Sequence, residues 1–323
     1  MNNYSWLEKR LHQLALSSKF MREVMFEFEN SSLRNFNDKA KHVFIAGQAR
    51  SGTTILLNSI YQSNIFASLT YEDMPFILSP NFWSKFKPQK RNEILLERAH
   101  GDNLKYSTKS PEAFEEVFWK TFSEDEYESR EKFKMYVSNI TYKYKKIRYI
   151  SKNNQNIKRL NLISKIFKNA KILVPFRDPL QQSYSILNQH NKFIKFEQND
   201  KFISTYMNLI GHTEFGPNYI PFFKEVIKFD NFSDINHWIE QWYLIYKNSF
   251  EILSQNKNVT FVCYEKLCNN KKYWYEILNK LEISESYEFI FKESIKKVDL
   301  KIDKNLLKLC NNLYSKLFDL FKN

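Results

Sequence analysis

Cysteine and glycine are scarce in this chain. Of its 323 residues, 3 are cysteines and 5 are glycines. Cys263, Cys268 and Cys310 form no Cys-x-x-Cys pair and no spacing typical of metal ligands, so we expect neither a disulfide framework nor a metal site. A reducing compartment suits this pattern. Because glycine is so rare, two glycines close together mark a place where the backbone needs them.

Long hydrophobic runs are missing as well. No stretch approaches the ~18–20 consecutive apolar residues that a membrane-spanning helix needs. The N-terminal residues 1–20 lack the apolar centre of a signal peptide. We therefore expect a soluble, cytoplasmic protein without a transmembrane segment.

Acidic residues are outnumbered by basic ones, 36 to 49, which gives a formal net charge of +13. Such an excess favours anionic partners, among them nucleotides, acidic polymers and membrane surfaces. The basic residues form no block typical of a nucleic-acid arm, so nucleic acid is not an expected partner. Aromatic residues make up 17% of the chain, so it has enough apolar area for a large core.

Apolar periodicity alternates between strand and helix along the chain. Strands are predicted at residues 43–46, 104–107, 146–152, 171–176 and 259–264, with a short extended piece at 69–75. Helices are predicted at residues 4–30, 55–60, 85–100, 112–122, 156–167, 180–193, 234–254, 273–281 and 306–321. Residues 123–132 read as an acidic surface patch and residues 200–222 as irregular. The alternation predicts an α/β fold with a parallel sheet flanked by helices and right-handed crossovers.

One domain is the simplest organisation, because no internal repeat or low-complexity linker divides the chain. We expect an N-terminal helical segment at residues 1–38, an α/β core at 41–285 and a C-terminal helical segment at 286–323. The N-terminal segment is expected to form a helix that packs on the core.

The clearest motif is a short apolar run followed by a loop with a glycine at each end. Val43–Ala46 is too short for a helix and rich in strand-forming residues, and a helix follows at residues 55–60. Gly47–Thr54, of sequence GQARSGTT, joins them and holds two of the five glycines. A strand, a glycine-bounded loop and a helix are typical of a phosphate-binding loop. Its backbone N–H groups point inward, and the helix N-terminus adds partial positive charge.

This loop has the spacing of a Walker A motif but lacks its lysine. A nucleoside triphosphatase places that lysine on the β- and γ-phosphates. Here Arg50 is the only charged residue within the loop, while Thr53 and Thr54 offer hydroxyls. We therefore expect an anion other than a magnesium-bound triphosphate. A kinase or nucleotide hydrolase of the P-loop class, or an ordinary strand–helix turn without a ligand, is the alternative.

A second candidate phosphate site follows the strand predicted at residues 171–176. Arg177 comes directly after this strand, and Ser185 lies eight residues further, in the predicted helix. An arginine and a hydroxyl at the carboxyl edge of a parallel sheet suit a second phosphate group. Taken alone, an arginine at a strand end is more often structural.

The two phosphate motifs together resemble the sulfotransferase family, whose donor is 3′-phosphoadenosine 5′-phosphosulfate (PAPS). The stretch Lys152–Phe176, which leads into Arg-Asp-Pro, is similar to the family's segment from its active-site lysine to the same tripeptide, although Lys168 replaces the usual proline. Val262–Leu267 is similar to a late strand of the family. The resemblance covers about residues 41–80 and 145–285.

This resemblance implies a sulfotransferase-like fold and transfer of a sulfuryl group from PAPS to an acceptor hydroxyl, without a metal. The residues implied to hold the 5′-phosphosulfate are Arg50, Ser51, Gly52, Thr53 and Thr54, and those for the 3′-phosphate are Arg177 and Ser185. Lys152 matches the family's active-site lysine and is the expected catalytic cation. Lys109, in a Lys-Ser-Pro segment that also resembles the family's active site, is the alternative.

Glu72 is the expected catalytic base. It lies 22 residues after Arg50, close to the offset of the catalytic glutamate in the branch of the family that acts on protein tyrosines. Asp73 beside it and His212 are alternatives. His212 belongs to Gly211–Gly216, a loop of sequence GHTEFG bounded by glycines. No third ligand is spaced to join a zinc site there.

The acceptor is expected to be a carbohydrate, such as a surface glycan made in the cytoplasm, with small metabolites and peptide tyrosines as alternatives. Residues 193–222 and 72–86 are expected to form its pocket, since loops carry specificity. A nucleotide-binding protein of this fold without transferase activity is the remaining alternative.

Overall fold

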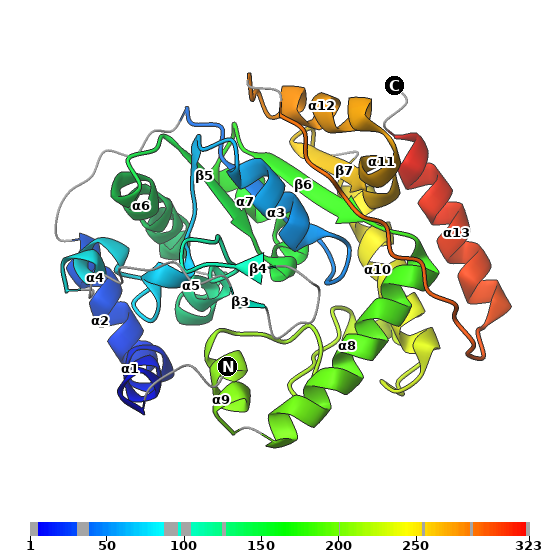
Figure 1. Ribbon diagram of the computed structural model, residues 1–323, viewed down its shortest axis with the longest axis horizontal. Coiled ribbons are helices and arrows are strands. Elements are labelled where there is room, and N and C mark those ends of the chain that lie inside the picture. The colour runs from blue at the N-terminus through cyan, green and yellow to red at the C-terminus, as the bar shows by residue number, and fades with distance from the viewer. Residues whose placement is uncertain are drawn as a thin grey trace.

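The computed structural model describes residues 6–30, 39–86, 96–97, 105–124, 127–199, 201–253, 256–284 and 287–320. Its centre is a five-stranded sheet in the order β2-β5-β1-β6-β7, in which every pairing is parallel (Figure 1). The strands are β1 (Val43–Ile45), β2 (Phe66–Ala67), β5 (Arg148–Lys152), β6 (Lys171–Phe176) and β7 (Val259–Cys263). Outside this sheet, β3 (Leu96–Glu97) and β4 (Lys105–Tyr106) form an antiparallel pair. The predicted parallel α/β sheet is confirmed.

Helices surround the sheet (Figure 1). They are α1 (Trp6–Ser17), α2 (Lys19–Asn30), α3 (Thr53–Tyr61), α4 (Pro80–Phe86), α5 (Glu116–Thr121), α6 (Tyr127–Lys143), α7 (Leu160–Ile166), α8 (Pro179–Asn199), α9 (Lys201–Leu209), α10 (Ile235–Leu253), α11 (Tyr264–Asn269), α12 (Lys271–Lys280) and α13 (Lys304–Asp319). Short 3₁₀ helices are η1 (Tyr71–Asp73), η2 (Asn154–Lys158) and η3 (Lys224–Val226).

Strand β1 separates two apolar clusters, because successive side chains of a strand point to opposite faces of the sheet. Val43 and Ile45 pack in the cluster that α3 and α12 cover. Phe44 packs in the larger cluster, which includes residues of α6, α7, α8 and α10. All three side chains are fully buried. A strand covered on both faces reads as a continuous apolar run, which is the pattern that predicted it.

The strand register sets the position of the carboxyl ends. Ile45, the last residue of β1, lies opposite Lys152 on β5 and Leu173 on β6. The chain that leaves β1 therefore starts beside Lys152. Asn153 N–H donates to Ile45 O at 3.0 Å and fixes this junction.

The N-terminal helix expected at residues 4–30 is two helices, α1 and α2, with a break at Ser18. The break lets Phe26 of α2 pack against Phe118 and Phe122, at centroid distances of 5.9 and 4.9 Å. Periodicity alone did not show it, because both helices continue the same apolar spacing. Most of the helix expected at 85–100 lies outside the described residues, and within it Leu96–Glu97 is a strand.

Three further expectations are corrected. The extended piece expected at 69–75 contains η1, because Thr70 and Asp73 form a capping box in which Thr70 N–H donates to Asp73 Oδ2 at 2.7 Å. The irregular stretch 200–222 contains α9, whose Tyr206 and Met207 are buried. The acidic patch 123–132 runs into α6, where Ser129 is buried.

The segment that follows α12 crosses the molecule before α13 begins (Figure 1). Within it, residues 287–303 form neither helix nor strand. Lys292 O accepts a hydrogen bond from Tyr264 OH at 3.0 Å, and Lys296 exchanges two hydrogen bonds with Gln181. Among the described residues, none of the helices is long and apolar enough to cross a membrane.

Candidate active site

The loop between β1 and α3 depends on a backbone conformation that side chains rarely permit. Gly52, the N-cap of α3, has φ 95°, in the left-handed region. A Cβ atom there would lie 2.4 Å from the ring of Tyr264. Arg50 also has a positive φ, 67°. The loop thus curls tightly before α3, as the strand–loop–helix pattern predicts.

The side chains of the loop point in different directions. Ser51 is fully buried, and its Oγ donates to Gln48 O at 2.8 Å, so this hydroxyl shapes the loop from inside. Thr53 Oγ1 donates to Asn154 Oδ1 at 3.4 Å, which ties the start of α3 to the segment after β5. Thr53 and Thr54 both line a cavity at this edge of the sheet.

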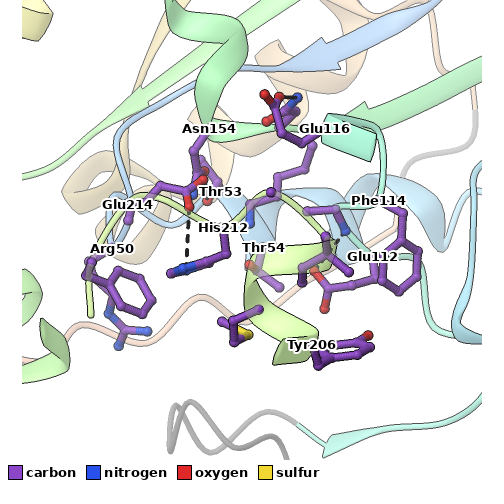
Figure 2. Close-up of a pocket in the computed structure, with 18 of the residues that line it drawn as sticks. Arg50, Thr53, Thr54, Glu112, Phe114, Glu116, Asn154, Tyr206, His212 and Glu214 are labelled. Carbon is purple, nitrogen blue, oxygen red and sulfur yellow. Dashed lines mark hydrogen bonds and ion pairs between the residues drawn. The ribbon is translucent and has the colours of Figure 1, made fainter. Parts of the chain in front are cut away.

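This cavity joins five separate parts of the chain. Its lining residues are Ala49, Arg50, Thr53, Thr54, Tyr71, Glu112, Ala113, Phe114, Glu116, Lys152, Asn153, Asn154, Tyr206, Met207, Ile210, Gly211, His212, Glu214 and Phe215. Figure 2 shows Arg50, His212 and Glu214 on one side and Glu112, Phe114 and Tyr206 on the other. A basic group from the loop therefore faces the same space as carboxylates and aromatic rings.

Lys152 brings a second cation to the cavity. It is the last residue of β5 and is 9% exposed. Its position follows from the register, because it lies opposite the last residue of β1. Asn153 beside it donates to Glu116 Oε2 at 2.7 Å and links this strand end to the segment that begins α5.

A sequence model described as "Sulfotransferase family" matches residues 42–284. This chain belongs to the sulfotransferase family. Its structure is similar to those of a sulfotransferase from Mycobacterium tuberculosis H37Rv (10% identity, TM-score 0.49, covering 95% of this chain and 81% of that one) and a sulfotransferase from Mycobacterium avium (10%, 0.48, 98% and 79%). No curated protein sequence matches the chain significantly.

The fold brings Arg50 and Ser185 together. Arg50 Nε donates to Ser185 Oγ at 3.1 Å, across from the loop to helix α8. The sequence interpretation paired Ser185 with Arg177 instead. The guanidinium of Arg177 donates to Ser294 O of the C-terminal segment, and its Nε lies 3.9 Å from Glu265 Oε1. Both expected phosphate residues thus lie near the carboxyl edge of β6, each with protein contacts of its own.

Glu72 is not among the described residues that line the cavity, although Tyr71 beside it is. The carboxylate of Glu72 accepts from Thr108 Oγ1 at 3.2 Å, and its backbone oxygen accepts from Trp83 Nε1 at 3.2 Å. Lys109, the alternative cation, follows Thr108 and is exposed. The structure therefore brings Glu72 near Lys109, not to the lining that holds Lys152.

Asp73 has a structural environment. It is fully buried and accepts from Thr70 N–H and from Tyr144 OH, both at 2.7 Å. Lys143 forms an ion pair with its other oxygen. These contacts stabilise η1 and hold the carboxylate away from solvent.

His212, the other alternative base, lines the cavity together with Lys152. Its Nε2 lies 3.5 Å from Glu214 Oε2, the contact drawn as a dashed line in Figure 2. Burial lowers the pKa of His212 below its usual value near 6.5, and the charge of Lys152 lowers it further, against the opposite effect of Glu214.

Two glutamates of the lining were missed by sequence reasoning. Glu112 Oε2 accepts from Tyr71 OH at 2.6 Å, and Glu116 forms a bidentate pair with Arg159 at 2.7 and 3.0 Å. Burial raises the pKa of Glu116. Glu112 directly follows the Lys-Ser-Pro segment, and that proximity was the one signal that pointed to it. Among the described residues, no group of three metal-ligating side chains could hold a metal ion.

Proposed function

We propose that this sulfotransferase moves a sulfuryl group from PAPS to a hydroxyl of an acceptor, and that it needs no metal. The observation that carries the proposal is the phosphate-type loop, with Arg50 and the N-terminus of α3, opening onto the cavity that also holds Lys152. A sulfuryl group carries less charge than a phosphoryl group, so protein cations and N–H donors suffice for it.

The donor would lie across the carboxyl edge of β1 and β6. Backbone N–H groups of Ser51–Thr54 and the guanidinium of Arg50 would hold the 5′-phosphosulfate. Arg177 and Ser185 would hold the 3′-phosphate. The hydrogen bond from Arg50 to Ser185 supports this arrangement, because it brings residues assigned to the two phosphate groups within 3.1 Å of each other.

In the reaction, the acceptor oxygen forms a bond to sulfur while the bond between sulfur and the bridging oxygen of the 5′-phosphate breaks. The electron pair of the broken bond stays on the bisphosphate, and the acceptor proton passes to a base. By analogy with phosphoryl transfer, negative charge grows on the bridging oxygen in a loose, in-line transition state. Lys152 would stabilise that charge, and its burial strengthens the interaction.

A carbohydrate is the proposed acceptor. The rings of Phe114, Tyr206 and Phe215 line the cavity together with the carboxylate of Glu112. Flat rings can cover the apolar face of a sugar, and carboxylate oxygens accept hydrogen bonds from its hydroxyls. The cytoplasmic location expected from the sequence stays a prediction.

Calorimetric titration with 3′,5′-bisphosphoadenosine, compared with ATP plus Mg²⁺, tests the donor site. We expect micromolar binding of the bisphosphate without metal and weaker binding of ATP. Arg50→Ala should weaken bisphosphate binding by about 1.5–3 kcal/mol, the range for a hydrogen bond to a charged group. A preference for ATP with Mg²⁺ would instead support a kinase-type site, and unchanged affinity in Arg50→Ala would remove the loop from the donor site.

A further inference from the structure

His212 and Glu214 occupy the cavity but belong to neither phosphate motif. They come from the loop after α9, far in sequence from the β1 loop and from β5. Yet His212 shares the lining of one cavity with Thr54 and Lys152. In Figure 2 the His212 ring lies between Arg50 and Thr54. A titratable ring thus lines the same cavity as groups proposed to hold the reacting sulfate.

Gly211 turns the chain so that His212 reaches this place. It lies two residues after the end of α9 with φ 77°, and its N–H donates to Asn208 O at 3.0 Å. His212 N–H then donates to Met207 O at 3.0 Å. A Cβ at position 211 would lie 2.9 Å from Glu116 Cγ, so only glycine allows the loop to pack this closely on the cavity wall.

The imidazole ring is held on several sides. It stacks on Phe193 at a centroid distance of 6.0 Å with an interplanar angle of 16°, and it meets Phe215 edge-on at 4.3 Å. Gln155 Nε2 donates to Thr213 Oγ1 at 2.9 Å and ties the loop to the segment after β5. These contacts fix the orientation of the imidazole before an acceptor binds.

Burial of His212 favours the neutral imidazole in the resting enzyme. Burial has the largest effect and lowers its pKa, and Lys152 on β5 lowers it as well. Glu214 on the same loop and Glu112 near the start of α5 act in the opposite direction. The net effect is a pKa below about 6.5, so at neutral pH a ring nitrogen has a lone pair available.

We propose that His212 is the general base that takes the proton of the acceptor hydroxyl, and that Glu214, 3.5 Å away, stabilises the imidazolium that forms. This inference rests on the proposed sulfuryl transfer. The acceptor oxygen forms its bond to sulfur as its proton moves to His212, and the bisphosphate leaves with the electron pair of the broken sulfur–oxygen bond. The proton ends on the ring, and Glu214 carries the compensating charge.

The positions of the two side chains favour His212 over Glu72 as the general base. Glu72 bonds to Thr108 and is absent from the described lining, whereas His212 lies in it with Lys152. A base must come within hydrogen-bond reach of the proton that it abstracts. An acceptor bound in the cavity would lie in the space that the imidazole lines.

His212→Asn is the decisive variant, since asparagine is polar and uncharged but takes no proton. We expect kcat to fall about 10²-fold or more, the usual range for a lost general base. Binding of 3′,5′-bisphosphoadenosine should change less than about twofold, because His212 is not among the residues assigned to the two phosphate groups and the bisphosphate lacks the sulfuryl group. Retention of more than about a third of the activity would overturn the proposal. If no bisphosphate binds to the unmodified enzyme, the donor proposal fails instead, so the two failures are distinguishable.

The pH profile gives a second readout that does not depend on how well His212→Asn folds. A base works only when it is deprotonated, so kcat/KM should fall as the pH drops through the pKa of His212, below about 6.5. Glu214→Gln removes a charge that raises this pKa, and the acidic limb should therefore move to lower pH. An acidic limb at the same pH in the unmodified enzyme and in Glu214→Gln would count against His212.

Glu72→Gln is the matched comparison, measured with the same acceptor. The proposal expects a smaller loss of kcat in this variant than in His212→Asn, and an acidic limb at the same pH as in the unmodified enzyme. A larger loss in Glu72→Gln, together with disappearance of that limb, would assign the base to Glu72 and reject His212.

Discussion

The two sides of the cavity were built in different ways. The donor side is mostly one contiguous stretch, Gly47–Thr54, that a strand and a helix hold in place. The acceptor side combines Tyr71, Glu112 and the stretch from Tyr206 to His212, which are three separate segments of the chain. A local motif can be recognised in a sequence because its residues shape one another directly. A site assembled from distant segments exists only after the chain has folded.

Lys152 combines the two cases, because it could be predicted locally but was placed by long-range pairing. Its place at a strand end could be read locally, and the parallel register then set it opposite Ile45 at the mouth of the loop. Substitutions can therefore ask whether the two sides act separately or as one site. The three that follow are ordered from the largest expected effect to the smallest.

Lys152→Met should have the largest effect on activity, because this lysine is proposed to stabilise the bridging oxygen of the bond that breaks between the donor and acceptor sides. We expect kcat to fall about 10²–10³-fold, as when one donor to a developing oxyanion is removed. Binding of 3′,5′-bisphosphoadenosine should change less than about threefold. Lys168→Met, at an exposed turn, is the matched control and should keep normal activity. Full activity in Lys152→Met would point to Lys109 as the catalytic cation.

Arg177→Ala should distinguish binding of the 3′-phosphate from binding of the 5′-phosphate on the donor side. We expect about 10- to 100-fold weaker binding of 3′,5′-bisphosphoadenosine, because a charged hydrogen bond contributes about 1.5–3 kcal/mol. Adenosine 5′-phosphate, which lacks the 3′-phosphate, should bind the variant as it binds the unmodified enzyme. Calorimetry with both ligands measures the difference. An equal loss for both ligands would mean that Arg177 acts by holding the C-terminal segment through Ser294.

Tyr71→Phe should affect the acceptor side alone, and least. It removes the hydroxyl that donates to Glu112 Oε2 at 2.6 Å and leaves the ring in place. We expect the acceptor KM to rise about 2- to 10-fold, which corresponds to about 0.5–1.5 kcal/mol for one hydrogen bond. Steady-state kinetics at saturating donor, with bisphosphate binding as the control, measures it. A changed bisphosphate affinity would show that the two sides are coupled.

Sequence periodicity located the central strands β1, β5, β6 and β7 and the helix after the loop, because a buried strand or an amphipathic helix leaves its period in the sequence. It was wrong where long-range packing decided the outcome. The break at Ser18 allows Phe26 to pack against Phe118 and Phe122, which lie almost a hundred positions away in the sequence. Helix α9 was not predicted from the sequence. It is stabilised by packing of its apolar residues, such as Tyr206 and Met207, against the core.

The candidate site shows the same division. The sequence predicted Arg50 and Lys152 as site residues, and both line the cavity, while their roles stay predictions. The family match from 42 to 284 agrees with the resemblance that the sequence motifs carry. The base could not be chosen from spacing, because spacing does not show which way a side chain faces. Asp73 lies beside Glu72 in the sequence, yet Asp73 is buried in a structural network while Glu72 bonds to Thr108.

The sequence by itself determined the strand, loop and helix that form the phosphate-type motif, since backbone hydrogen bonding and glycine conformation act within a few residues. It also determined the parallel α/β class through its alternating periodicities. Only the tertiary structure decided that Ser185 contacts Arg50, and that His212 lines the same cavity as Lys152. Those pairings depend on how segments far apart in the chain pack together, and packing is a property of the whole core.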